Sequence, residues 1–214
     1  YSRFGNPTVA MFEDRMALLE GAPCACATAS GMAAVSATLL CCLKAGDHIV
    51  AAKVLFGAIR FVIENLLPRW GIQFTLVDGT KLAEWRSAIQ PNTKLVFFES
   101  PANPTLEILD IKRISEIAHA QGARVVVDNA MASPALQRPM EFGADIVVHS
   151  STKYIDGHGR ALGGVILCQD NFLKEHLQVF LRNTGPTISP FSAWLHLKSL
   201  ETLQSQMPGS LLKL

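Results

Sequence analysis

The stretches V-V-V-D-N-A at residues 125–130 and I-V-V-H-S-S-T-K-Y at 146–154 decide the fold. Each opens with three apolar, β-branched residues, which is typical of a strand that is buried on both faces. Each then becomes polar, at Asp128 in the first stretch and from Ser150 to Lys153 in the second. We therefore expect an acid and a lysine at the carboxyl ends of two neighbouring strands.

Similar apolar runs alternate with helical patterns along most of the chain. Strands are expected at residues 24–28, 48–54, 72–77, 94–98, 124–127, 146–148 and 164–167. Helices are expected at 9–20, 31–43, 57–67, 81–89, 111–121, 171–182 and 190–204. This order predicts an α/β fold of three layers, α/β/α, with a mostly parallel sheet. In such sheets ligands bind beyond the carboxyl ends of the strands, where Asp128, Lys153, Glu99 and Ser100 are expected.

Several helix boundaries follow from local signals. Ser30 is expected to cap the helix at 31–43, and Pro68 to stop the helix at 57–67. Ser189 and Pro190 match an N-cap followed by proline at the first helical position. The final residues, P-G-S-L-L-K-L at 208–214, belong to no expected element.

The composition narrows the class of protein. Of the 214 residues, 49% are hydrophobic and 17% are charged, which suits buried parallel strands. The formal net charge is +1 without a basic block, so nothing indicates binding to nucleic acid or to an anionic membrane. No apolar run has the length or purity of a membrane span.

The cysteines and histidines give no sign of a metal site. Five cysteines stand mostly in apolar segments without a C-x-x-C pair: Cys24, Cys26, Cys41, Cys42 and Cys168. We expect them to be buried, reduced thiols of a cytoplasmic protein. The six histidines lack ligand spacing, so no metal is expected.

An acid and a lysine at neighbouring strand ends suit a site for pyridoxal 5'-phosphate (PLP). The lysine amine can bond to the cofactor's aldehyde, and the carboxylate keeps the pyridine nitrogen protonated so that the ring can accept electrons. Alone, Asp128 would equally suit a turn and Lys153 a surface charge. The rest of the chain has to decide between these interpretations.

A phosphate anchor should accompany the lysine. Gly31 and Met32 follow Ser30 at an expected helix start, where free backbone N–H groups and the helix dipole favour an anion. Ser150 and Thr152 flank Lys153 and can offer hydroxyls. A helix cap and loop residues would explain each of these alone, but beside Lys153 they favour a phosphate site.

A competing interpretation, a dinucleotide-binding domain, rests on G-H-G-R-A-L-G-G at 157–164. The motif G-x-G-x-x-G requires glycine where Leu162 stands, and it opens a helix after a strand. Here the stretch precedes an expected strand. The sequence therefore disfavours this alternative.

Six motifs in order resemble one family over almost the whole chain. They are Y-S-R-F-G-N-P-T at 1–8, A-S-G-M-A-A at 29–34, E-S-P-A-N-P at 99–104, V-D-N-A at 127–130, S-S-T-K-Y at 150–154 and G-P-T-I-S-P-F at 185–191. The chain is similar to the Cys/Met-metabolism family of fold-type-I, aspartate-aminotransferase-like PLP enzymes. That family includes cystathionine γ-synthase, cystathionine γ-lyase, methionine γ-lyase and the homoserine sulfhydrylases.

The resemblance implies a role for each matching position. Lys153 corresponds to the lysine that binds PLP and moves protons, and Asp128 to the partner of the pyridine nitrogen. The phosphate ligands correspond to Gly31, Met32, Ser150 and Thr152.

Four further positions complete the implied site. Asn103 falls near the cofactor ring, and Phe56 takes the place of the usual stacking tyrosine. Stacking needs only the ring face, so it survives this change. Tyr1 and Arg3 fall in a segment that reaches the phosphate of a neighbouring subunit in this family, so a homodimer or homotetramer with a shared site is implied.

Two departures point to one branch of the family. Phe56 and Gly157-His158-Gly159-Arg160 are most similar to the O-succinylhomoserine sulfhydrylase branch. Such an enzyme replaces the succinyl group of O-succinylhomoserine with sulfide and forms homocysteine. Cystathionine γ-synthase and γ-lyase chemistry stay open as alternatives.

The resemblance also implies a longer subunit. We expect an N-terminal segment and interface arm at 1–20, a PLP-binding domain at 21–185, and at 186–214 the start of a connection to an absent C-terminal domain. That domain carries the family's arginine for the substrate carboxylate, and Arg160 and Arg182 are candidates by charge alone. A truncated, non-catalytic PLP-binding remnant is therefore a further hypothesis.

Overall fold

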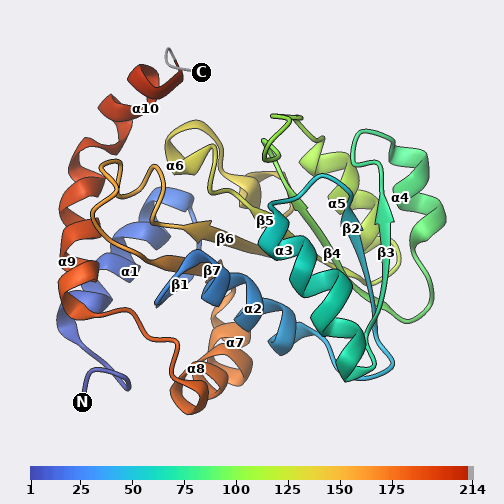
Figure 1. Cartoon of the computed structure of the whole chain (residues 1–214), viewed down its shortest axis with the longest axis horizontal. Coiled ribbons are helices and arrows are strands. Elements are labelled where there is room, and N and C mark those ends of the chain that lie inside the picture. Colours follow the sequence, from blue (N-terminus) through green and yellow to red (C-terminus); the bar gives the residue numbers. More distant parts are fainter. Residues whose placement is uncertain (212–214) are drawn as a thin grey trace.

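One seven-stranded sheet forms the centre of the molecule, as the computed structural model shows for residues 1–211, apart from the side chains of Lys174 and residues 208–211 (Figure 1). The strands lie in the order β1-β7-β6-β5-β4-β2-β3. Their bounds are β1 Cys24–Thr28, β2 His48–Ala52, β3 Gln73–Val77, β4 Thr93–Glu99, β5 Arg124–Asp128, β6 Ile146–Ser150 and β7 Gly164–Cys168. Only β7 runs against its neighbours β1 and β6. The predicted mostly parallel sheet is thus confirmed.

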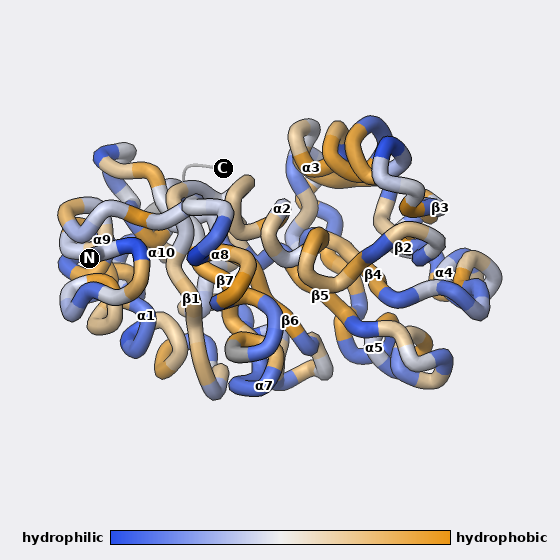
Figure 2. The backbone as a smooth tube through the Cα atoms, turned by 90° about the horizontal axis from the view of Figure 1, so that it is seen from below, coloured by the Kyte–Doolittle hydropathy of each residue, from blue (hydrophilic) through white to orange (hydrophobic). Residues whose placement is uncertain are grey.

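Helices cover both faces of this sheet. Their bounds are α1 Pro7–Glu20, α2 Gly31–Cys42, α3 Gly57–Phe61, α4 Leu82–Ala88, α5 Ile111–His119, α6 Ser133–Leu136, α7 Asp170–Phe172, α8 Gln178–Thr184, α9 Pro190–Ser199 and α10 Leu203–Leu211. Figure 2 shows α3 on one side of the strands and α4 and α5 on the other. The predicted three-layer arrangement follows from this placement.

Apolar strands explain why the sheet lies at the core. Every residue of β2 and β7 is buried, as are the last four residues of β5. Strands covered on both faces need apolar side chains at every position, which is the pattern that the sequence shows. The carboxyl ends of β4, β5 and β6 consequently come together at one edge.

Trp85 anchors α4 to the sheet. Its side chain is fully buried, its indole N–H donates to the Gly79 carbonyl at 3.0 Å, and its ring meets Phe98 edge-on. We expect Trp85→Ala to lower the free energy of unfolding by about 3–5 kcal/mol, because it leaves a large cavity. Urea denaturation would measure this loss. Half-exposed Trp70 is the control, and a Trp85 effect no larger than that of Trp70→Ala would contradict the prediction.

Two expected helix boundaries were wrong. The first helix begins at Pro7 rather than residue 9, because the Asn6 side chain accepts hydrogen bonds from Thr8 and Val9 N–H groups and caps it. The third continues from α3 through a π-helical turn, Val62–Leu66, and a 3-10 turn, Leu67–Trp70. Pro68 fits into the start of that 3-10 turn, where its missing N–H is not needed.

The segment after β7 also differs from expectation at its end. The expected helix at 171–182 is α7, a π-helical turn Leu173–Leu177 and α8, and Ser189 caps α9 as predicted. A 3-10 turn, Leu200–Thr202, then leads into α10, so the final heptapeptide starts inside a helix. Residues 212–214 of that heptapeptide lie outside the described part of the chain.

Helices α1 and α9 pack against each other beside β1. The Phe12 ring stacks on His196 with ring centroids 5.5 Å apart, and both side chains are buried. The expected division into three segments stays a prediction.

Two other expectations concern exposure. Cys168 is buried, whereas Cys24, Cys26, Cys41 and Cys42 are half-buried, so the expectation of buried thiols was too general. Within the described residues, no helix has the length and apolar character needed to cross a membrane.

Candidate functional site

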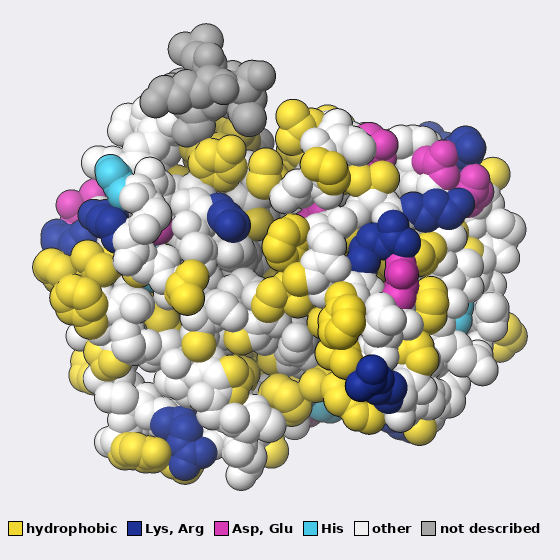
Figure 3. Space-filling view, in the orientation of Figure 1, with side chains coloured by type: hydrophobic (Ala, Val, Ile, Leu, Met, Phe, Trp, Pro, Cys, Tyr) yellow, Lys and Arg dark blue, Asp and Glu magenta, His cyan; other side chains and the backbone are white. Residues whose placement is uncertain are grey.

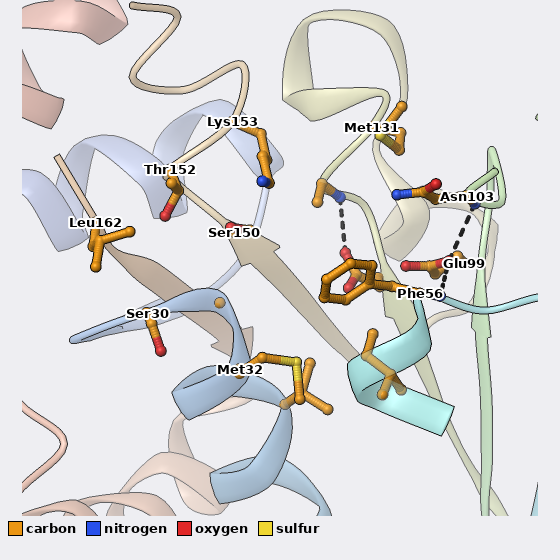
Figure 4. A pocket seen from close by; sticks show the side chains of 15 residues that line it. Ser30, Met32, Phe56, Glu99, Asn103, Met131, Ser150, Thr152, Lys153 and Leu162 are labelled. Carbon is orange, nitrogen blue, oxygen red and sulfur yellow. Dashed lines mark hydrogen bonds between the residues drawn. The ribbon is translucent and has the colours of Figure 1, made fainter. Parts of the chain in front are cut away.

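A cavity of about 240 Å³ lies at the sheet edge where β4, β5 and β6 end. Eight of the ten predicted site residues line it: Gly31, Met32, Phe56, Asn103, Asp128, Ser150, Thr152 and Lys153. Figure 4 shows Lys153, Thr152 and Ser150 facing Phe56, Asn103 and Glu99 across this space. Apolar side chains gather over α2 and α3 on the same face of the molecule (Figure 3).

The start of α2 forms one end of the cavity. The Ser30 hydroxyl accepts the Ala33 N–H at 3.1 Å, which leaves the N–H groups of Gly31 and Met32 in the uncapped first turn. Gly31 lies so close to β6 that an added Cβ would come within 2.5 Å of the Ser150 Cβ. This contact brings the positive end of the helix dipole next to the Ser150 hydroxyl.

Gly31→Ala should disturb this end of the cavity without unfolding the protein. The new methyl group has to push α2 away from β6, and such overpacking costs about 1–3 kcal/mol. We expect affinity for PLP to fall by about tenfold to a hundredfold in an absorbance titration. Gly57→Ala, at the first position of α3 with open space around it, is the control. Equal affinities for both variants would refute a close cofactor contact at Gly31.

The Thr152 hydroxyl has a structural task in this arrangement. It donates to the Gly163 carbonyl at 3.2 Å and accepts the Gly163 N–H at 3.1 Å. These bonds join the segment after β6 to the residue before β7. A hydroxyl has one proton, so Thr152 can donate to a phosphate only by giving up the Gly163 carbonyl.

Asp128 forms the opposite end of the cavity. It is the last residue of β5, it is 7% exposed, and its Oδ1 accepts the Ala130 N–H at 2.9 Å. Burial raises the pKa of Asp128 above its usual range, whereas the Ala130 N–H and His149 oppose that rise. A carboxyl in this position gains most from a cationic partner in the cavity.

Glu99 is a pocket residue to which the sequence interpretation gave no role. It ends β4 in register with Asp128, and parallel strands in register present their side chains on the same face. Its place after an apolar run, inside the motif E-S-P-A-N-P, was the available signal.

A buried polar network supports the same sheet edge from the opposite face. His149 Nε2 and Glu20 Oε2 lie 2.8 Å apart, and both side chains are fully buried. The Asn129 amide donates to the Gln137 carbonyl at 2.8 Å and to Glu20 at 3.4 Å, and the Gln137 amide donates to the Ser100 carbonyl at 2.6 Å. The network thus connects the ends of β4, β5 and β6 with the end of α1.

Lys153 lies in a compact turn after β6. Its N–H donates to the Ser150 carbonyl, and its carbonyl accepts the Gly157 N–H at 2.8 Å. Within the described residues, its amine forms no ion pair and borders the cavity. The side chain is therefore available to a ligand.

Arg160 and Arg182 do not line this cavity. Arg160 Nε lies 3.3 Å from Asp156 Oδ1, and its guanidinium also donates to the Ser199 hydroxyl at 2.5 Å. Arg182 lies at a second cavity, with its guanidinium 5.9 Å from the centre of the Phe4 ring. Both candidates for the substrate carboxylate are thus engaged elsewhere.

Tyr1 and Arg3 also lie apart from the other eight predicted residues. Tyr1 is 86% exposed, and the Arg3 guanidinium donates to the Arg182 carbonyl at the second cavity. Their role at a neighbouring subunit stays a prediction. The described residues contain no cluster of three His, Cys, Asp or Glu side chains that could hold a metal ion.

Comparison with known proteins identifies related sequences. The model of the family described as "Cys/Met metabolism PLP-dependent enzyme" matches residues 1–210. O-succinylhomoserine sulfhydrylase of Mycobacterium tuberculosis is 52% identical over 210 residues, covering 98% of this chain and 52% of that protein. L-methionine gamma-lyase of Porphyromonas gingivalis is 44% identical, covering 97% of this chain and 52% of that protein.

A solved structure shares the fold. The crystal structure of metB from Corynebacterium glutamicum superposes with a TM-score of 0.93 at 40% identity. The superposed region covers 96% of this chain and 53% of the metB chain. The chain thus spans about half the length of the curated relatives that it matches.

Proposed function

Because the chain belongs to the Cys/Met metabolism family of PLP-dependent enzymes, we propose that it forms the cofactor-binding part of a γ-replacement enzyme. The proposed reaction exchanges the succinyl group of O-succinylhomoserine for sulfide and yields homocysteine. The observation that carries this choice is the 52% identity to a protein named O-succinylhomoserine sulfhydrylase, with all eight cavity-lining site residues assembled.

The two ends of the cavity fit the two ends of PLP. Gly31, where even a Cβ would collide with Ser150, leaves room only for backbone N–H groups beside a phosphate. At the other end, buried Asp128 suits a protonated pyridine nitrogen. Lys153 borders the space between them.

Each side chain then has a definable task. When bound, PLP supplies an aldehyde for the substrate amine and a ring that stabilises negative charge at the substrate Cα. Asp128 holds a proton on the ring nitrogen, while Phe56 packs on the ring face. Gly31, Met32 and Ser150 hold the phosphate, and Thr152 fixes the neighbouring segment through Gly163.

Lys153 moves the protons of the reaction. Its amine would hold the cofactor and, once displaced by the substrate amine, would be free to take the proton from the substrate Cα. Lys153 would pass that proton on to the bound cofactor, and its neutral amine could then take a proton from Cβ, so that the γ-substituent leaves as succinate with the bonding electrons. Sulfide then adds at Cγ, and the protons return to Cβ and Cα.

Elimination is the competing chemistry, since a relative at 44% identity is named L-methionine gamma-lyase. The test is an assay of the PLP-loaded protein with O-succinylhomoserine and sulfide, with homocysteine and 2-oxo acid measured separately. Homocysteine without 2-oxo acid supports replacement, whereas 2-oxo acid in this assay, or in a parallel assay with methionine as the substrate, favours elimination. A Lys153-bound cofactor without any turnover would favour the non-catalytic, PLP-binding alternative, and the same assay with cysteine tests for cystathionine formation.

The proposal includes assembly as a homodimer or homotetramer in the cytoplasm. The exposed Tyr1 and the separation of Arg3 from the cavity of its own chain support a shared site. The test is to mix Arg3→Ala subunits with Lys153→Ala subunits and to measure activity. If sites are shared, a mixed dimer has one intact site, in which Lys153 of one subunit meets Arg3 of the other, so activity should return. Absence of any regained activity in assembled mixtures would contradict sharing.

A further inference from the structure

Glu99 lines the cavity together with Phe56, Asn103 and Asp128, yet no step of the proposed reaction uses it. It is the last residue of β4, it is 5% exposed, and it lies in register with Asp128 on β5. Two carboxyl groups therefore share one face of one sheet edge. Such an arrangement is costly unless one group keeps its proton or a cation lies between them.

One oxygen of Glu99 organises two separate segments. Its Oε2 accepts the Phe56 N–H at 2.9 Å and the Asn103 N–H at 3.2 Å (Figure 4 draws the Asn103 bond). Phe56 precedes the first residue of α3, and Asn103 lies in the segment after β4. These are the two residues that are expected at the face and the edge of the cofactor ring. Glu99 thus fixes their backbone positions relative to Asp128.

The surroundings decide which of the two carboxyls carries a proton. Burial raises the pKa of Glu99, the charge of Asp128 raises it further, and the two backbone N–H groups act against this rise. Asp128 has His149 on the neighbouring strand β6, which favours its charged form. Lys153, in the segment after β6, is the other charged group of the cavity lining. The pyridine nitrogen, which the proposed function places at Asp128, favours ionised Asp128 as well.

We propose that Glu99 is a positioning residue of the cofactor site that works as a neutral carboxylic acid. Its Oε2 accepts from Phe56 and Asn103, and its Oε1 carries a proton next to the Asp128 carboxylate. The cavity then holds one carboxylate for the ring nitrogen rather than two, and the ring-contacting segments stay in place. The inference rests on the proposed PLP site.

The test compares Glu99→Gln with Glu99→Ala. Glutamine keeps an oxygen for the two backbone N–H groups and an N–H group in place of the acid proton. We expect its affinity for PLP at pH 7 to stay within about threefold of the wild type, since an N–H donor replaces the O–H donor. Alanine leaves the two part-buried N–H groups of Phe56 and Asn103 without their acceptor, so the segments that contact the ring lose their anchor, and binding should weaken by tenfold or more. Glu116→Gln, on the exposed face of α5, is the matched control.

A second readout needs no cofactor. A carboxyl whose folded pKa lies above its ordinary value of 4.5 contributes stability that is complete below that value and is lost as the pH rises through the folded pKa. The apo wild type should therefore lose stability from about pH 5 to pH 8, and Glu99→Gln should reduce this loss. Burial also raises the pKa of Glu13, to about 7, so Glu13 contributes a loss that both proteins share. Glu116→Gln should leave it unchanged.

Two results would overturn the inference. If Glu99→Gln weakened PLP binding as much as Glu99→Ala, the charged form would be the one required. If Glu99→Ala bound PLP like the wild type, Glu99 would not position the ring contacts. A wild type without a borohydride-reducible bond to Lys153 would instead refute the proposed function, and the apo pH profile would still decide whether Glu99 carries a proton.

Discussion

Replacement of Lys153 by alanine should abolish the bond between protein and cofactor and reduce turnover by at least about 10²–10⁴-fold. That range is the usual contribution of one positioned general acid–base group, and in the proposed function Lys153 also holds the cofactor covalently, so the loss can be larger. The remaining cavity wall should stay intact, because the turn around Lys153 is formed by its backbone bonds to Ser150 and Gly157. Borohydride reduction with mass mapping would locate the adduct, and the homocysteine assay would measure turnover.

Lys112→Ala is the control for this experiment. Lys112 is exposed on α5, away from the cavity lining, so its variant should keep both the adduct and the turnover. A reduced cofactor found on Lys153→Ala, attached at another lysine and with unchanged turnover, would show that Lys153 is not the cofactor-binding residue.

Asp128→Asn should lower turnover by about 10²- to 10³-fold while the adduct on Lys153 still forms. Loss of one partner of a buried ion pair costs about 3–5 kcal/mol, and asparagine cannot compensate a protonated ring nitrogen. Aldehyde bonding does not need that proton to the same degree, so covalent attachment and turnover should separate. Absorbance after PLP addition and the rate of homocysteine formation would record the two effects.

Asp14→Asn, an equivalent change on the exposed side of α1, should leave both quantities as they are. Wild-type turnover by a folded, PLP-loaded Asp128→Asn protein would rule out the assigned role of the carboxylate. A parallel measurement on Glu99→Gln distinguishes the two neighbouring acids, because only Asp128 is expected to need its charge.

Local sequence patterns were sufficient to predict the sheet edge. Residues 125–128 and 146–150 each form an apolar strand that ends in a polar residue, and this pattern depends on burial within the strand itself. The helix starts at Ser30 and Ser189 were predictable for the same reason, since a cap acts within one turn. Asn6 and Pro7 carry the same signal as Ser189 and Pro190, so the start of α1 at Pro7 also follows from a local pattern.

Other features depend on contacts between distant segments. Glu20 and His149 are far apart in the sequence, and no spacing rule predicts their fully buried contact. The place of β1 at the sheet edge likewise depends on packing. Its neighbour in the sheet is β7, the last strand in the sequence, and not β2, the strand that follows β1 along the chain. Glu99 was recognisable as a strand end, but its bonds to Phe56 and Asn103 required the fold.

Pro68 shows how a correct rule can give a wrong boundary. Proline disfavours continuation of an α-helix. Here the backbone instead changes to a tighter 3-10 turn, and Pro68 lies in the first two positions of that turn, where its missing N–H is not needed. Burial of Leu67 in the core holds the turn in place. Tertiary packing therefore extended the helical segment past the residue that should have ended it.

The reversed direction of β7 separates the part of the chain that forms the rim of the cavity from the strand ends that form its floor. Because β7 returns beside β6, the chain between Ser150 and Gly164 never leaves the ligand edge, as a crossover helix would require it to do. Hydrogen bonds hold this segment in place, one between Thr152 and Gly163 near its two ends and one between Arg160 and Asp156 within it. Mutations between these two contacts can change the rim of the cavity while the strand ends with the proposed cofactor contacts stay unchanged. Proteins with this topology can therefore change the rim that meets a substrate without altering the strand ends at which the proposed cofactor binds.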